Sequence, residues 1–370
     1  MRGVIPFGRV AGIPIGASWT WLPVVVLVVS NYAGDVFPST NPGLSNGTYL
    51  GMAIALTALF FGGLILHELG HAFIARRNGM EIQGITLWLF GGVARITGEF
   101  AGPGVEFRVA LAGPVVTCVL AVGFTAASLL FDLPSAVDGV VSMVAVANLF
   151  LLAFNLIPAY PLDGGRILHA VLWRFQRDRG AATRLSAGIG RGFGIVLIGV
   201  GIAGVLAAQD ARWGWLSVMG LFLLMAATGE QRTEQVRSLL DGLTVADVIE
   251  RDPTCVLPSL TLSEFVGAVV WAQRYTTYPV YDGERVVGML PFRSVAAVPR
   301  ADWETTRVGD VMTPLSGVVL LEEEQSLTDA AGKLSADSLQ RGLVLDGDKL
   351  VGLVSISDIA RAFERRARAV

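Results

Sequence analysis

Six long apolar stretches restrict this chain to a multi-pass membrane fold. Each approaches the roughly 20 residues that an α-helix needs to cross a bilayer. Only 16% of the 370 residues are charged, whereas soluble domains carry about 25%. The mean hydropathy is +0.59. We therefore expect six transmembrane helices, at residues 17–30, 50–75, 109–130, 140–157, 189–208 and 213–227, followed by a polar final third.

The charges between the stretches predict their orientation. Arginines gather before the first stretch, after the second, and between the fourth and the fifth. Loops 31–48, 131–138 and 209–212 instead carry aspartates and a single arginine, Arg212. The positive-inside rule then puts both termini and the polar third in the cytoplasm, in what we expect to be a prokaryotic cell membrane. We expect no cleavable signal peptide, because no small-residue cleavage site follows the first stretch.

Charge and cysteine content exclude two further classes. A net charge of −3 without a basic run argues against a nucleic-acid partner. The two cysteines, Cys118 in an apolar stretch and Cys255 in the polar third, cannot supply a disulfide framework or a second metal site.

An ionisable cluster interrupts the second apolar stretch. His67 and His71 are four residues apart, which places both imidazoles on one face of a helix within reach of one metal ion. Glu68 falls near that face and can accept a proton from water. Ionisable residues in a membrane span indicate function, and the chain has only three histidines. We therefore expect a metal site here.

A third ligand has to come from elsewhere, because a catalytic zinc usually takes three protein ligands and a water. Asp163 is the leading candidate, since two prolines bend the backbone ahead of it and Gly164-Gly165 allow close approach behind it. The competing interpretation is that Asp163 only caps the helix that follows. His169 lies on that helix, but its position in the sequence fits no known spacing of metal ligands. We therefore expect that it does not bind the metal.

Residues 81–100 differ from the apolar stretches around them. They are rich in β-branched and aromatic side chains and contain Gly91-Gly92. This predicts a short membrane-embedded β-hairpin beside the metal site, because non-helical backbone at that depth has to be buried in protein or line a wet cavity. An ordinary cytoplasmic loop is the alternative. A free strand edge there could pair with an unwound substrate segment.

Together these motifs resemble the signature of site-2 proteases, which are intramembrane zinc metalloproteases. The resemblance covers residues 14–227 and rests on His67-Glu68-x-x-His71, Gly91-Gly92-Val93 and Asn155-x-x-Pro158-x-x-Pro161-x-Asp163-Gly164. It implies one Zn²⁺ held by His67, His71 and Asp163, with Glu68 as the general base. It further implies Asn155 as a donor to the developing oxyanion and Gly91-Gly92-Val93 as the strand that aligns substrate. Ala112-Gly113-Pro114 also fits the family, and we interpret it as a helix-packing site.

The implied activity is endoproteolysis of transmembrane segments in membrane-tethered proteins. The substrate is then a helix in the lipid, whose backbone carbonyls are held in i to i−4 hydrogen bonds. It has to unwind locally before its peptide bond can be attacked.

The polar third contains an internal repeat. Residues 243–249 echo 306–312, and residues 278–290 echo 343–354. Each unit is typical of a strand, a turn, a strand and a helix. This resembles a tandem pair of cystathionine-β-synthase (CBS) domains. We predict a membrane core at 1–230, a linker at 231–242, and CBS domains at 243–300 and 301–370.

The two repeats differ where the family binds nucleotide. Gly352-x-x-Ser355-x-x-Asp358 keeps the hydroxyl and carboxylate that the family directs to phosphate and ribose, whereas the first repeat has Pro291 and Ser294 there. Two interpretations stay open. The pair binds an adenine nucleotide at Ser355 and Asp358, or it is a structural module that joins two copies as a homodimer.

A second function class also stays open, a CBS-gated transporter or channel whose histidines bind a transported ion. Such a protein is expected to show internal repeats in its membrane half, and the first three stretches do not resemble the last three. We therefore favour the protease. The expected fold class is a six-helix membrane core with a short β-hairpin, followed by a soluble α/β CBS pair.

Overall fold

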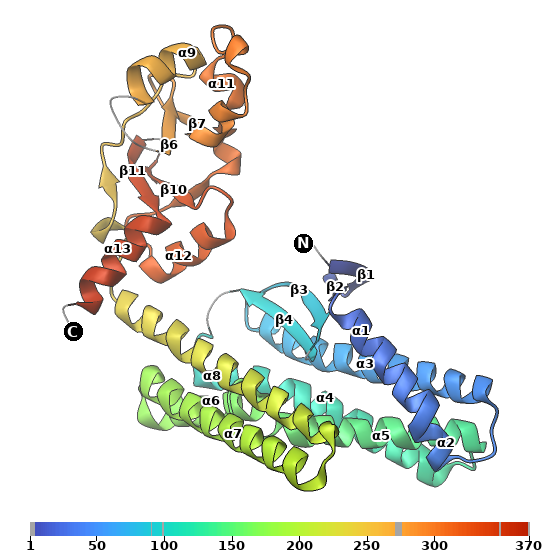
Figure 1. Ribbon diagram of the computed structural model, residues 1–370. Helices are drawn as coiled ribbons and strands as arrows, with labels where there is room; N and C mark the ends of the chain where they lie inside the picture. Colours follow the sequence, from blue (N-terminus) through green and yellow to red (C-terminus); the bar gives the residue numbers. More distant parts are fainter. Residues whose placement is uncertain (1–3, 90, 98–99, 271–275, 348, 369–370) are drawn as a thin grey trace. The chain divides into compact units, whose positions relative to one another are not determined.

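The computed structural model describes residues 4–89, 91–97, 100–270, 276–347 and 349–368 (Figure 1). The chain divides into two compact units, Met1–Glu234 and Gln235–Val370. Helix α8 (Gly214–Leu240) begins in the first unit and ends in the second.

Within the described residues, six helical stretches are long and apolar enough to cross a membrane. They comprise α1 (Trp21–Asn31) with a π turn (Tyr32–Val36) and α2 (Phe37–Thr40), then α3 (Asn46–Arg77), α4 (Pro103–Leu130), α5 (Ser135–Asn155), α7 (Arg179–Ala208), and a 3₁₀ turn (Ala211–Trp213) leading into α8. This confirms the predicted six-helix fold class.

The bounds differ from those predicted. The first helix begins at Trp21 because residues 17 and 18 belong to a strand. The fifth begins at Arg179 because Asp178 caps it there, its side chain accepting a hydrogen bond from the Ala181 N–H. Helices extend beyond their apolar segments, so hydropathy alone underestimates their length.

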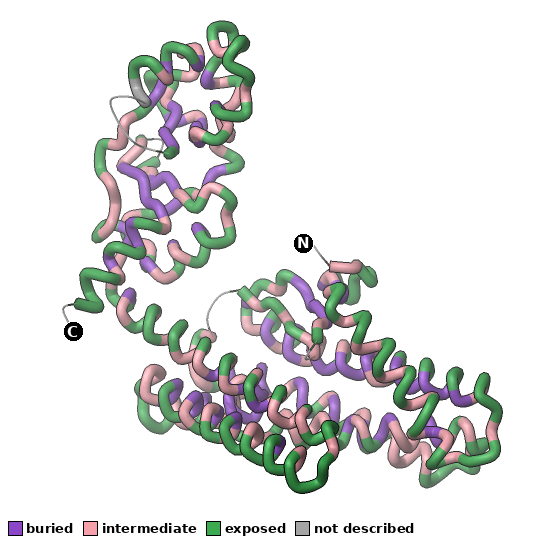
Figure 2. Tube along the Cα trace, in the orientation of Figure 1, coloured by how far each residue is buried: buried purple, intermediate pink, exposed green. Residues whose placement is uncertain are grey.

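Many residues of the long helices in the first unit are exposed (Figure 2), and a number of these have large apolar side chains. Examples on α4, α5 and α7 are Val119, Leu129, Phe150 and Leu206. Extended exposed apolar surface of this kind marks a contact with lipid or protein, which agrees with spans that cross a membrane.

A four-stranded sheet packs on α3. It consists of β1 (Val4–Val10), β2 (Ile13–Ser18), β3 (Glu81–Trp88) and β4 (Gly91–Thr97), in that order, so β4 lies at an edge. β3 and β4 form the predicted antiparallel hairpin, with Ile85 opposite Ala94. Residues 90, 98 and 99 of that prediction lie outside the described residues. The sequence did not predict β1 and β2, although β2 pairs in parallel with β3.

A short helix completes the first unit. α6 (Asp163–Gln176) follows the loop after α5 and contacts both α4 and α7. Its first residue is the candidate ligand Asp163.

The second unit holds the two repeats. β6 (Thr277–Tyr281), β7 (Val286–Pro291) and α10 (Phe292–Ala296) correspond to β10 (Arg341–Asp346), β11 (Lys349–Ser355) and α13 (Ile356–Ala367). The predicted order of strand, strand and helix is therefore present in both. The shorter elements are β5 (Glu250–Arg251), α9 (Leu262–Phe265), α11 (Val308–Val311), β8 (Thr313–Pro314), β9 (Val319–Leu321) and α12 (Leu327–Ala336).

The repeats interlock. β5 of the first repeat pairs with β11 of the second, and β8 of the second pairs with β7 of the first. Val245 likewise packs in the core of the second repeat, and Val308 in that of the first. The predicted boundary at 300/301 therefore separates two repeats in sequence and not two independent cores.

Candidate active site

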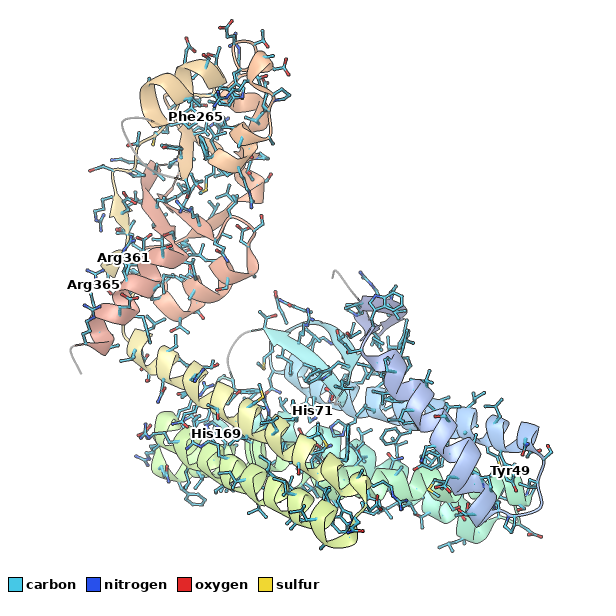
Figure 3. All side chains as sticks on the ribbon, in the orientation of Figure 1. Tyr49, His71, His169, Phe265, Arg361 and Arg365 are labelled. Carbon is cyan, nitrogen blue, oxygen red and sulfur yellow. The ribbon has the colours of Figure 1, made fainter. Side chains whose placement is uncertain are left out.

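Three ligand atoms converge between α3 and the start of α6. The Nε2 atoms of His67 and His71 lie 3.1 Å apart. Asp163 approaches both, with Oδ2 3.1 Å from His67 Nε2 and Oδ1 3.3 Å from His71 Nε2. Both histidines are buried, and Figure 3 labels His71 inside the helical unit. The structure thus brings together the three residues that the sequence singled out.

Helix α4 orients both rings. His71 Nδ1 is 2.7 Å from the carbonyl oxygen of Val109, which can only accept, so Nδ1 carries the proton and Nε2 presents a lone pair. His67 Nδ1 is 2.8 Å from Thr117 Oγ1, and Thr117 is fully buried. Such outer contacts fix the tautomer and direction of metal-binding histidines.

Gly113 leaves the space that the rings occupy. A Cβ atom at this position would lie 2.3 Å from His71 Nε2 and 2.6 Å from His67 Nε2. We interpreted Ala112-Gly113-Pro114 as a helix-packing site, and Ala112 does face α3, 3.0 Å from where a Cβ on Gly70 would be. The structure adds that Gly113 lies directly against the imidazoles.

The donor set fits a metal ion. Asp163 Oδ2 is buried and has no hydrogen-bond partner among the described residues, although His67 Nε2 lies 3.1 Å away. Lone pairs that face one another at this distance repel unless a cation lies between them. Two imidazoles and one carboxylate are a common ligand set for catalytic zinc.

Glu68 lies beside the hairpin. It is buried, and its Oε2 accepts a hydrogen bond of 3.1 Å from the Ala94 N–H on β4. A Cβ on Gly92 would lie 2.6 Å from Glu68 Cγ, so only glycine fits there. Gly91 has a φ of 136°, which also favours glycine. Within Gly91-Gly92-Val93, Gly92 is therefore the residue that lies against the candidate base.

The loop before α6 folds back on the end of α5. A Cβ on Gly164 would lie 2.3 Å from the Leu156 carbonyl oxygen, and one on Gly165 2.4 Å from the Tyr160 nitrogen. Asn155 is the last residue of α5 and directly precedes Leu156. Because Gly164 packs against the Leu156 carbonyl, the backbone at Asn155 lies near the start of α6. Its half-buried side chain makes no hydrogen bond to the described residues.

His169 lies outside the ligand group. Its Nδ1 is 2.8 Å from Glu106 Oε2 and its Nε2 is 3.0 Å from Thr183 Oγ1. This pair could not be predicted from sequence, because its members lie 63 residues apart.

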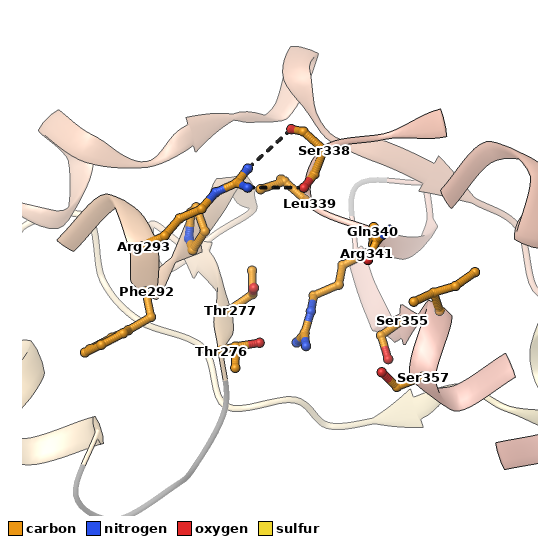
Figure 4. Close-up of a pocket in the computed structure, with 12 residues that line it drawn as sticks. Thr276, Thr277, Phe292, Arg293, Ser338, Leu339, Gln340, Arg341, Ser355 and Ser357 are labelled. Carbon is orange, nitrogen blue, oxygen red and sulfur yellow. Dashed lines mark hydrogen bonds between the residues drawn. The ribbon is translucent and has the colours of Figure 1, made fainter. Parts of the chain in front are cut away.

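The CBS pair contains a pocket of about 430 Å³, lined by both polar and apolar side chains (Figure 4). Arg293 and Arg341 line it, with the hydroxyl side chains Thr276, Thr277, Ser338, Ser355 and Ser357. The Arg293 guanidinium donates hydrogen bonds to the carbonyl oxygen and to the Oγ of Ser338, both at 3.3 Å. Arg341 has no ion-pair or hydrogen-bond partner for its guanidinium among the described residues, and its side chain points into the pocket.

The two predicted nucleotide residues are hydrogen-bonded to each other, since the Ser355 hydroxyl donates to the Asp358 carboxylate, but only one of them lines the pocket. Ser355 lines the pocket, whereas Asp358 does not. The Asp358 carboxylate accepts the Ser355 N–H at 2.8 Å and pairs with Arg361, so it caps α13.

Comparisons with known proteins find similar proteins for both units. The model of Peptidase family M50 matches residues 55–136 and 133–199, and the CBS domain model matches residues 308–365. A solved site-2 protease from Methanocaldococcus jannaschii is 28% identical, covers 62% of this chain and 95% of its own, and has a TM-score of 0.44. The CBS-pair protein CBSX2 from Arabidopsis thaliana is 23% identical over 34% of this chain and 98% of its own, with a TM-score of 0.31.

Full-length relatives extend the match to both units. Rip3 of Mycobacterium tuberculosis, named as a candidate zinc metalloprotease, is 33% identical over 369 residues, which is 98% of this chain and 94% of Rip3. A Synechocystis protein with a similar name is 30% identical over 99% of this chain and 97% of its own length. Because the identity extends over nearly the whole of both chains, this protein belongs to Peptidase family M50, the site-2 protease family of zinc metalloproteases, and carries a C-terminal CBS pair.

Proposed function

We propose that this protein is a zinc-dependent endopeptidase that cleaves transmembrane segments of membrane-tethered proteins within the bilayer. The supporting observation is the convergence of His67, His71 and Asp163 beside Glu68, inside a helix that is apolar enough to span a membrane. These three residues would hold one Zn²⁺. The arginine distribution supports an orientation with both termini and the CBS pair in the cytoplasm.

Each side chain around the proposed metal site has a separate role in peptide hydrolysis. Zn²⁺, when bound, polarises the scissile carbonyl and acidifies the attacking water. Glu68 accepts a proton from that water and returns it to the leaving amide nitrogen. The Asn155 amide donates a hydrogen bond to the oxyanion, a contribution of about 3 kcal/mol where such donors have been removed in other enzymes. Val109 and Thr117 hold the imidazoles in place.

The edge strand β4 supports substrate alignment. β4 pairs with β3 on one side only, and Gly92 and Ala94 lie against Glu68. An extended peptide can add to such an edge through main-chain hydrogen bonds. A transmembrane helix has to unwind to do so, so helix-weakening residues near the cleavage site favour cleavage.

Glu68→Gln tests this activity. Cleavage of a co-expressed reporter with one transmembrane helix should fall by at least about 100-fold, because a positioned base contributes roughly 10²–10⁴. Bound zinc should stay at the wild-type level, since Glu68 is not a ligand. The matched control is Glu81→Gln, an exposed glutamate at the start of β3, which should cleave normally. Undiminished cleavage by Glu68→Gln would remove Glu68 from its role.

The same variant can identify the substrate. An inactive enzyme that retains its zinc should hold its substrate longer than the wild type does. Crosslinking of the Glu68→Gln protein followed by mass spectrometry should therefore enrich single-span membrane proteins, and Asn155→Ala should show the same enrichment if Asn155 acts only after binding.

We also propose that the CBS pocket binds an adenine nucleotide that modulates the protease. Arg341 is a cation without a partner among the described residues, in a pocket rich in hydroxyl groups that suits a phosphate. Thr276 and Thr277 come from the first repeat and Ser355 from the second, so a ligand there would contact both. Calorimetric titration of the full-length protein with ATP and AMP tests binding. The absence of any nucleotide-dependent heat would favour a structural module, which light scattering would then show as a dimer.

A further inference from the structure

The first unit buries a second ionisable pair outside the ligand group. Glu106 on α4 and His169 on α6 are each 2% exposed, and His169 Nδ1 lies 2.8 Å from Glu106 Oε2 (Figure 3). Burial of such groups is costly unless their hydrogen bonds are complete. Neither residue takes part in the proposed chemistry, so the pair requires another explanation.

The pair is fully engaged by its neighbours. The Tyr160 hydroxyl donates to Glu106 Oε1 at 3.3 Å. Thr183 Oγ1 lies 3.0 Å from His169 Nε2 and donates its own proton to the Arg179 carbonyl at 3.0 Å. The Thr183 oxygen therefore accepts from His169 Nε2. This chain of directional bonds fixes the ring of His169 at both nitrogens.

These bonds connect the segments that carry the metal ligands. Glu106 lies one turn before Val109, whose carbonyl holds His71. Tyr160 lies three residues before Asp163, and α6, which begins at Asp163, carries His169. On the far side of the loop, a Cβ on Gly190 of α7 would lie 2.4 Å from the Tyr160 carbonyl oxygen, so the loop has little room to shift.

We propose that the Glu106–His169 pair is a positioning element that sets the separation between the Asp163 carboxylate and the two imidazoles. Glu106 ties α4, which orients the histidines, to the loop and helix that carry Asp163. Directional hydrogen bonds fix the register between these elements, whereas apolar contacts would allow them to slide. This proposal rests on the proposed ligand set, and neither residue touches the metal.

Metal binding by the full-length protein in detergent tests the proposal. The probes are the Zn²⁺ dissociation constant from competition with a chelating dye, and the visible absorption bands of Co²⁺-loaded protein, which report ligand geometry. Glu106→Ala and His169→Ala should each weaken Zn²⁺ binding about 10-fold and shift the Co²⁺ bands. This is the lower end of the range seen when a direct contact of a metal ligand is lost, because these residues act on the ligands through their neighbours. The double variant should bind no more weakly than either single variant, because the two residues act as one unit.

Two conservative variants separate positioning from packing. His169→Asn places an amide nitrogen near the position of Nδ1 and should keep the contact with Glu106, so its affinity should stay within about threefold of wild type. In His169→Gln the amide lies near the position of Nε2 and contacts Thr183 instead of Glu106. This variant should therefore lose Zn²⁺ affinity as His169→Ala does. If the alanine variants do not fold, the comparison of His169→Asn with His169→Gln decides between positioning and packing. Equal Zn²⁺ affinities for these two variants would overturn the proposal.

Helix α7 offers a matched control. Ser186 is fully buried one turn from Thr183, and its Oγ has no partner among the described residues. Ser186→Ala should leave affinity and spectrum unchanged, whereas Thr183→Val should weaken binding. Wild-type affinity and an unshifted Co²⁺ spectrum in folded Glu106→Ala would overturn the proposal alone. Failure of the wild-type protein to bind Zn²⁺ or Co²⁺ would instead overturn the proposed ligand set, and this inference with it.

Discussion

The proposed metal centre of the first unit and the pocket of the CBS pair both present polar side chains, but they are organised differently. At the metal centre, donor atoms of three side chains lie within 4.8 Å of one another, and α4 holds both rings by their outer nitrogens. In the CBS pocket, Arg293 donates to Ser338, and Asp358, which lies beside the pocket, caps α13. Arg341 also lines the pocket, and its guanidinium has no hydrogen-bond or ion-pair partner among the described residues.

The two sites therefore differ in how far their side chains are already positioned for a ligand. The proposed metal centre presents converging lone pairs from three side chains, an arrangement that suits one small cation. The CBS pocket presents one available positive charge among hydroxyl groups from two repeats, which favours an anion and allows adjustment. Substitutions should therefore have large, sharply localised effects at the first site and moderate effects at the second.

Gly113→Ala should give the largest effect, because its Cβ would lie 2.3 Å from His71 Nε2 and would displace both rings. We expect zinc affinity to fall by at least about 100-fold, beyond the loss of a single outer contact. The control is Gly123→Ala on the same helix, where the new Cβ would meet no atom of the described residues within 4 Å beyond its own stretch of helix backbone. That variant should keep its zinc and gain about 0.5–1 kcal/mol in helix stability. Normal metal content in Gly113→Ala would show that the rings are not confined.

Thr117→Val should give the next effect. It keeps the shape of the side chain but removes the hydroxyl next to His67 Nδ1, so zinc affinity should fall about 10- to 100-fold. Thr57→Val on α3 is the matched control, since that hydroxyl only donates to the Ala53 carbonyl. Dye competition measures both, and equal affinities for the two variants would contradict the role given to α4.

Arg341→Ala should act moderately and only at the CBS pair. Loss of a hydrogen bond to a charged group costs about 1.5–3 kcal/mol, so ATP binding measured by calorimetry should weaken by roughly 10- to 100-fold. Zinc content should not change. Arg285→Ala, in the exposed turn between β6 and β7, is the control. If both variants bind ATP as the wild type does, the nucleotide occupies another place.

The smallest effect concerns the acid stability of the CBS pair. The backbone N–H and hydroxyl of Thr261 donate to Glu264, which holds the pKa of that exposed carboxyl below its usual range. Its stabilisation is therefore present above the unfolded pKa, near 4.5, and is lost as the pH falls through the folded value. Thermal unfolding of Glu264→Gln should show a smaller loss of Tm between pH 7 and pH 3 than the wild type. The exposed Glu324→Gln should keep the wild-type slope.

Local spacing explains which features could be predicted from sequence. The separation of His67 and His71 determines their shared helix face without any knowledge of the fold. Asp163 required the additional argument that zinc needs a third donor. Val109, Thr117 and Glu106 could not be predicted as partners, because their contacts depend on how α4 packs on α3 and α6.

The same reasoning applies to the strands. The repeated segments around Tyr278 and Leu343 predicted two hairpins correctly. The exchange of β5 and β8 between repeats could not be foreseen, because two-residue strands have no periodicity. β1 and β2 could not be predicted because Pro6 and Gly8 in β1, and Pro14 and Gly16 in β2, interrupt the alternation of apolar and polar residues.

Metal content of the purified full-length protein tests the central claim most directly. The measurement is zinc per chain by mass spectrometry after dialysis against metal-free buffer, for the wild type and for Asp163→Ala. The proposed site predicts about one zinc per wild-type chain and a large loss in Asp163→Ala, with both proteins folded. A wild-type protein without stoichiometric metal, or an Asp163→Ala protein that retains all of it, would contradict the proposed site.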